Sequence, residues 1–96
     1  MSMTDEELKE LILASLTGST ERNPLPYRDI AINIALEKGV INSIYVPYAD
    51  LEQTYRKQFE SNMEELMNCG FVRALPNSTE PFYAQRLFVI ANASEN

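Results

Sequence analysis

The chain has 96 residues, of which 45% are hydrophobic and 23% are charged, and its formal net charge is -6. A chain of this length has surface enough for one hydrophobic core, so the sequence predicts a single domain over residues 1–96. No run approaches the roughly 18 apolar residues of a membrane span. The acidic start MSMTDEELKE is unlike a secretory signal, and there is a single cysteine. These features predict a cytoplasmic protein without a membrane partner.

The first predicted helix covers about residues 5–17. It begins after Thr4-Asp5-Glu6-Glu7, which has the form of a capping box, in which Thr4 and Glu7 each satisfy a free backbone N–H. Its buried face follows the spacing of an amphipathic helix and comprises Leu8, Leu11, Ile12 and Leu16. Gly18 suits the left-handed residue that ends a helix.

The second predicted helix covers about residues 27–38. Residues 18–26 are rich in turn-forming residues and are expected to be a loop. Pro26 fits the first turn of the helix, where its missing N–H costs nothing. The apolar stripe consists of Tyr27, Ile30, Ala31, Ile34 and Ala35. Residues 40–46 then contain several β-branched and aromatic residues before Pro47, which predicts a short strand or an extended connector.

The third predicted helix covers about residues 48–68, where neither Gly nor Pro interrupts the chain. One face is apolar throughout and comprises Leu51, Tyr55, Phe59, Met63, Leu66 and Met67. Ser61 to Glu64 form a second capping box, so a break near Phe59 to Ser61 is the alternative to one continuous helix.

Two strands are predicted within residues 71–91. Residues 71–75 and 83–91 are rich in strand-forming residues, and PNSTEPF between them suits a hairpin loop. Because side chains alternate along a strand, Phe88 and Ile90 point to one face and Val89 to the other. Apolar residues on both faces imply that both are covered. The fold class is therefore α+β and mainly helical, with three helices followed by a C-terminal β-hairpin.

The order of these elements and the junction LMNCGFVRAL, residues 66–75, resemble the winged helix-turn-helix class. The resemblance covers Tyr27 to Ala91 and implies that the third helix is a DNA-recognition helix and the hairpin a wing. One feature departs from the class, because thirty residues lie between Gly39 and Gly70. The usual turn and helix need about half to two-thirds of that length. The recognition helix is therefore either lengthened or begins near Tyr55 or Ser61.

The resemblance also implies a set of nucleic-acid contacts, which are Gln53, Arg56, Lys57 and Asn62 on the helix and Arg73 and Arg86 on the hairpin. Arg and Lys bind phosphate or guanine, whereas Gln and Asn suit adenine. However, residues 48–68 contain two basic and five acidic residues, a net charge of -3. The alternative is an ordinary solvated helix with favourable four-residue pairs, and a structural role for the two hairpin arginines.

Catalysis is not expected from this sequence. The chain has no histidine, no glycine-rich phosphate loop and no cluster of metal-ligating residues, so no cofactor, metal or small-molecule substrate is expected. Cys69 has no imidazole partner, and its expected role is that of a small buried residue at a helix end.

Two function classes fit the sequence. The first is a small DNA-binding transcription regulator, a homodimer that pairs through the first helix or through the strand face of Phe88 and Ile90. The alternative is an acidic protein–protein interaction module that mimics nucleic acid or binds a basic partner. A regulator requires basic residues that converge on one face, whereas a module shows them dispersed or neutralised. Among the tyrosines, Tyr45 and Tyr48 are the expected contact residues, and the others are expected in the outer core.

Overall fold

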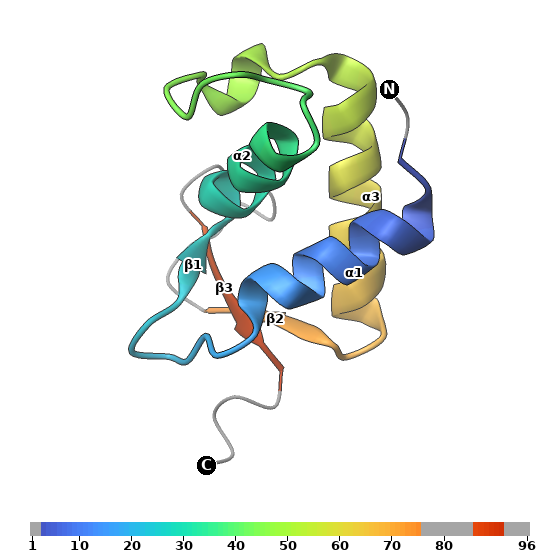
Figure 1. Cartoon of the computed structure of the whole chain (residues 1–96). Coiled ribbons are helices and arrows are strands. Elements are labelled where there is room, and N and C mark those ends of the chain that lie inside the picture. The colour runs from blue at the N-terminus through green and yellow to red at the C-terminus, as the bar shows by residue number, and fades with distance from the viewer. Residues whose placement is uncertain (1–2, 76–85, 92–96) are drawn as a thin grey trace.

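The architecture is α+β and mainly helical, as the sequence predicts. The computed structural model describes residues 3–75 and 86–91 (Figure 1). In chain order the elements are α1 (Asp5–Leu16), β1 (Leu25–Pro26), α2 (Tyr27–Glu37), the single 3-10 turn η1 (Tyr48–Asp50), α3 (Gln53–Asn68), β2 (Val72–Ala74) and β3 (Leu87–Ile90). The predicted hairpin loop, residues 76–82, and the predicted start of the last strand lie outside the described residues.

Helix α1 begins and ends almost where its sequence predicts. The Thr4 hydroxyl accepts a hydrogen bond of 3.0 Å from the Glu7 N–H, which is half of the predicted capping box. The last helical residue is Leu16, one residue short of the predicted end. Gly18 then takes a backbone φ of +85°, a left-handed conformation that glycine adopts without steric cost. The predicted helix is confirmed.

Helix α2 is buried on most of its circumference, since six of its eleven residues are buried. It begins directly after Pro26, which has an extended backbone and occupies the N-cap position. The prediction that Pro26 lies in the first turn of the helix is therefore wrong. The Tyr27 N–H, which α2 leaves without an intrahelical partner, donates to the Arg86 carbonyl at 2.8 Å. The start of α2 is therefore fixed to the chain just before β3.

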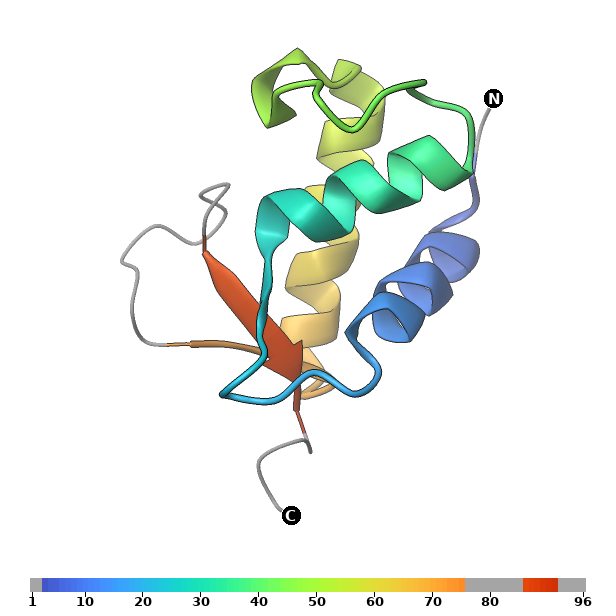
Figure 2. The same cartoon turned by 60° about the vertical axis from the view of Figure 1, so that its left-hand side comes forward.

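A small antiparallel sheet closes one end of the molecule, with strand order β1-β3-β2 (Figure 2). Leu25 of β1 pairs with Phe88, and Ala74 of β2 pairs with Phe88 from the other side. The prediction of a plain loop over residues 18–26 is wrong at its end, because β1 is a two-residue strand. Its pairing depends on β3, which lies some sixty residues later, so no local pattern indicates it.

The predicted third helix is broken near its start. The 3-10 turn Tyr48–Asp50 is followed by extended backbone at Leu51, and α3 begins at Gln53. The Glu52 carboxylate caps α3 by accepting from the N–H groups of Thr54 at 3.3 Å and Tyr55 at 3.2 Å. The alternative break near Phe59 to Ser61 is wrong, because α3 is continuous there.

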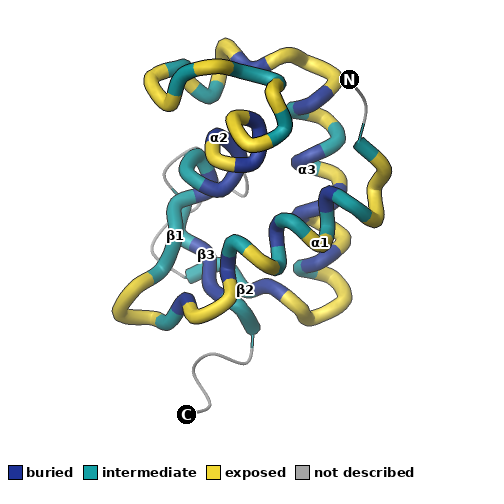
Figure 3. Tube along the Cα trace, viewed as in Figure 1, coloured by how far each residue is buried: buried dark blue, intermediate teal, exposed yellow. Residues whose placement is uncertain are grey.

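One hydrophobic core joins all three helices and the sheet. Helix α3 contributes Tyr55, Phe59, Met63 and Leu66 to it, and the sheet contributes Val72 and Phe88. The rings of Tyr27 and Phe59 meet edge to face with their centroids 5.0 Å apart, the geometry that aromatic pairs favour. Figure 3 shows the buried segments of the helices turned toward this shared interior.

Candidate interaction surfaces

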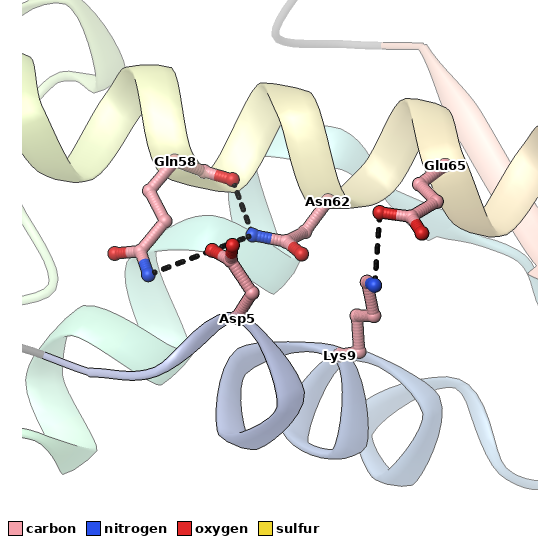
Figure 4. Close-up of polar contacts among 5 residues, drawn as sticks. All are labelled: Asp5, Lys9, Gln58, Asn62 and Glu65. Atoms are coloured by element: carbon pink, nitrogen blue, oxygen red, sulfur yellow. Dashed lines mark hydrogen bonds and ion pairs between the residues drawn. The ribbon is translucent and has the colours of Figure 1, made fainter.

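The predicted nucleic-acid residues on α3 do not all lie on its exposed face. The side chain of Asn62 is buried, with 2% of the residue exposed. Its amide donates to Asp5 Oδ1 at 3.0 Å and to the Gln58 carbonyl at 2.8 Å (Figure 4). The prediction of a solvent-facing Asn62 is wrong, because it lies three residues after Phe59 and four before Leu66, on the same buried face.

Asp5 is the centre of a polar junction between α1 and α3. Its carboxylate accepts from Asn62 and from Gln58 Nε2, the latter at 3.2 Å. The hydrogen bonds from Asn62 and then Gln58 hold the pKa of the Asp5 carboxyl below its ordinary value. One turn further along, Lys9 Nζ lies 2.8 Å from Glu65 Oε1, and this bond raises the pKa of Lys9. Both pairs join α1 to α3 (Figure 4).

Several basic residues are neutralised within the molecule. Lys9 pairs with Glu65 and Lys38 with Glu7, each at 2.8–2.9 Å. Arg73 of β2 lies 2.9 Å from Glu21 Oε2, in the segment that joins α1 to β1. Arg73, one of the predicted phosphate ligands, is therefore engaged with a carboxylate on another element.

The remaining predicted nucleic-acid residues occupy different environments. Gln53 and Lys57 are exposed on α3, four residues apart, while Arg56 is half-buried. The positive charge of Arg56 acts to lower the pKa of the Tyr48 hydroxyl, against the larger effect of burial. Arg86 is half-buried just before β3. Towards the other end of α3 the exposed charges are Glu64 and Glu65. The structure thus brings together Gln53, Arg56 and Lys57, and separates them from Asn62 and Arg73.

The strand face predicted to form a homodimer interface belongs to the core. Phe88 has no exposed surface, and its ring centroid lies 5.8 Å from that of Tyr27. Ile90 is partly buried against the core, and its N–H donates to Ser19 Oγ at 2.9 Å. The assignment of Phe88 to an intermolecular contact is wrong, because the core already covers it. Val89 on the other face is also buried, so the expectation that both faces are covered is confirmed. The homodimer itself stays a prediction.

Cys69 lies in the turn after α3, where its thiol is free and exposed. The prediction of a buried cysteine is wrong, because the core-facing positions of α3 end at Leu66. Within residues 3–75 and 86–91, no group of three or more His, Cys, Asp or Glu side chains has the arrangement of a metal site. In the same part of the chain, no helix combines the length and the apolar character that crossing a membrane requires.

Helices α2 and α3 are joined by residues 38–52, the α2–α3 connector. It is made of turns and bends and includes η1, with no strand, so the predicted strand over residues 40–46 is wrong and the segment is an irregular connector. Arg28 of α2 fixes it by donating from Nη2 to the carbonyls of Ile44 at 2.8 Å and Val46 at 3.2 Å. A charged donor makes stronger hydrogen bonds than a neutral one. These two hydrogen bonds fix the backbone of the connector against α2.

The second anchor of the connector is Tyr48. Its hydroxyl donates to Glu60 Oε2 at 2.8 Å and is hydrogen-bonded to the Tyr27 hydroxyl at 3.2 Å. Burial, together with the bond to Glu60, raises the pKa of Tyr48 to about 12. Tyr48, a predicted contact residue, thus has its hydroxyl engaged inside the molecule.

Tyr45 has the opposite environment. It is 85% exposed, and its neighbour Ile44 is 48% exposed. Within the described residues the other large exposed hydrophobic side chains are Leu36 and Phe71, on α2 and beside β2. The connector is therefore a place where two adjacent apolar side chains face solvent on a backbone that Arg28 holds.

Two adjoining hollows lie along the connector, and Gly39 and Val40 form part of both walls. The larger, about 610 Å³, extends to Met3, Glu52, Tyr55 and Gln58. The smaller, about 350 Å³, extends to Ile41, Asn42, Val46 and Asp50. Together they form the connector groove.

Comparison of this chain with protein-family models, with curated proteins and with solved structures finds no match. A function for this chain is therefore inferred from its own contacts and charges.

Proposed function

We propose that this chain is a small protein-interaction module of winged-helix-like architecture, and that its contact surface is the α2–α3 connector. The observation that carries the proposal is the exposure of Ile44 and Tyr45 on a backbone anchored by Arg28 and Tyr48. Tyrosine is among the residues most enriched at the energetic centres of protein interfaces. A loop that is already ordered loses little conformational entropy on binding.

The winged-helix-like description is supported by the order of the elements. Three helices precede a β2–β3 pair, and a two-residue strand before α2 completes the sheet. The shape by itself does not specify a ligand, because function depends on the chemistry of a site. The connector, at fifteen residues from Lys38 to Glu52, is much longer than the three or four residues of a helix-turn-helix turn.

The charge distribution favours a protein partner over DNA. Affinity for a phosphate backbone comes from basic side chains that release condensed counterions. In this chain Lys9, Lys38 and Arg73 are paired with carboxylates, and the chain carries a net charge of -6. Exposed Glu64 on α3 would repel a DNA backbone placed along that helix.

A DNA-binding regulator is the second candidate, and one observation favours it. Gln53, Arg56 and Lys57 lie in the first half of α3, and Gln53 and Lys57 are exposed there. Binding of a fluorescent random duplex at about 50 mM salt, the condition that exposes non-specific attraction, separates the two candidates. We expect no binding. Salt-sensitive binding that Lys57→Glu abolishes and Glu64→Gln strengthens would replace the first candidate with the second.

The protein-binding proposal is tested by affinity capture from an extract of the source cells. Wild type is compared with the double variant Ile44→Ser/Tyr45→Ser and with Leu36→Ser, which changes an exposed apolar residue on α2. Partners retained by wild type and Leu36→Ser should be lost from the double variant, with the melting temperature unchanged. Equal retention by all three proteins would exclude the connector as the contact surface.

A further inference from the structure

The connector groove is lined by both apolar and acidic residues. Its apolar wall is formed by Met3, Val40, Ile41, Val46 and Tyr55. The hydroxyl of Tyr55 donates to the Ala31 carbonyl at 2.7 Å, so its polar atom is engaged inside the fold. The groove thus combines apolar side chains with polar ones such as Thr54, Gln58 and Asn42, and it has room for more than one side chain.

Both charged residues that line the groove are acidic. Asp50 lines the smaller hollow and Glu52 the larger. Hydrogen bonds from the Thr54 side chain and the Tyr55 backbone hold the pKa of Glu52 below its ordinary value, so its carboxylate is ionised at neutral pH. A carboxylate has about four acceptor positions, so the α3 cap leaves Glu52 able to accept from a bound cation.

Lys38, a basic residue beside the groove, and the Gln58 amide in its lining are already engaged within the molecule. Lys38, next to Gly39, bonds to Glu7 Oε2 at 2.9 Å. The Gln58 amide, another lining group, donates to the Met3 carbonyl at 2.7 Å and to Asp5. The groove is therefore lined by two acidic residues together with apolar side chains, and no basic residue lines it among the residues that the structure describes.

We infer that the connector groove binds an extended segment of a partner protein in which Lys or Arg is flanked by apolar side chains. The inference rests on the proposed function and specifies its partner. A cationic side chain matches Asp50 and Glu52, and apolar neighbours match Val40 and Tyr55. A nucleic-acid phosphate is repelled by the same carboxylates, and a second copy of this chain brings a further charge of -6.

The test is selection from a library of random peptides of about 12 residues, a length that an extended-peptide site accommodates. Immobilised wild-type protein should enrich peptides with Lys or Arg beside apolar residues. Fluorescence anisotropy of an enriched peptide should show about threefold weaker binding to Asp50→Asn and to Glu52→Gln, the scale of exposed charge pairs. Glu52→Gln keeps an oxygen for the α3 cap. Glu64→Gln, which makes the same charge change on the exposed face of α3, should bind as wild type does.

Other outcomes overturn the inference in distinguishable ways. Enrichment of neutral or acidic peptides, no enrichment, or equal binding by the Asp50→Asn/Glu52→Gln double variant would each reject the groove as a site for basic segments. A dimer that Val40→Glu dissociates would assign the groove to a second copy. If binding of captured partners still requires Tyr45, the proposed function stands without the groove. If the chain instead binds duplex DNA, both fail.

Discussion

The α1–α3 junction and the α2–α3 connector are held together by different forces. At the junction, Leu8, Ile12 and Leu16 of α1 are fully buried, and the polar contacts of Asp5 and Lys9 add to that packing. In the connector Leu51 alone is buried, and the backbone is fixed by Arg28 and Tyr48. Apolar burial therefore dominates in the helical body, while the connector combines partial packing of Val40, Ile41 and Val46 against the core with a few polar bonds. This difference leaves Ile44 and Tyr45 available to a partner.

The largest effect is expected from truncation of the core beneath both regions. Phe59→Ala removes a fully buried ring that contacts Tyr27 and Tyr55, and should lower the free energy of unfolding by about 3–5 kcal/mol. Phe71→Ala, at a position 55% exposed, is the matched control and should cost less than about 1 kcal/mol. Urea denaturation measures both. Equal losses would contradict the position of the core.

Removal of the Arg28 anchor should loosen the connector and leave the α1–α3 junction unchanged. Arg28→Ala deletes both hydrogen bonds to the carbonyls of Ile44 and Val46, at a cost of about 1–2 kcal/mol. Amide hydrogen exchange should accelerate in residues 40–50 and remain slow in α1 and α3. Arg22→Ala changes an exposed arginine elsewhere and serves as the control. Faster exchange throughout the chain would mean that the connector is part of the cooperative core.

The polar contacts of the α1–α3 junction should contribute only moderately to the free energy of unfolding. Asn62→Ala should lower stability by about 1 kcal/mol, because the neighbouring apolar packing remains. The bonds to Asp5 lower the pKa of that carboxyl from 3.8, so its contribution is present above this pH and is lost as the pH falls through the lower folded value. The difference between wild type and Asn62→Ala should therefore narrow below about pH 3.8. Asn68→Ala, at an exposed position, should show no such pH dependence.

The smallest effect is expected at Tyr48. Tyr48→Phe removes the bond to Glu60 and should cost roughly 0.5–1 kcal/mol at neutral pH. The pKa of Tyr48 is raised from 10.0 to about 12, so its contribution is present below pH 10 and is lost as the pH rises towards 12. Thermal melts of both proteins between pH 8 and pH 12 should therefore converge at the alkaline end. If the difference in melting temperature stayed constant up to pH 12, the Tyr48 hydroxyl would not stabilise the fold through its hydrogen bond to Glu60.

The extent to which the sequence predicts this structure follows from the range of each interaction. The capping residue Thr4, the stripe of α2 and the junction at Gly70 act within one or two helical turns, so their patterns are visible locally. The start of α3 is harder to predict from the sequence, because its N-cap is Glu52 and glutamate is not among the common N-cap residues. The burial of Asn62 was available from its spacing to Phe59 and Leu66, but its polar side chain suggested an exposed position.

The sequence by itself determined the three helices, the approximate hairpin and the acidic charge, because helix periodicity and composition need no distant partner. The tertiary structure alone decided that β1 pairs with β3, that Arg28 holds the connector and that Val40 and Asp50 line one groove. Each of these depends on groups that are far apart in the chain and adjacent only after the core has packed. The candidate interaction surface belongs to this second class, since its exposed and acidic side chains become a site only through those long-range contacts.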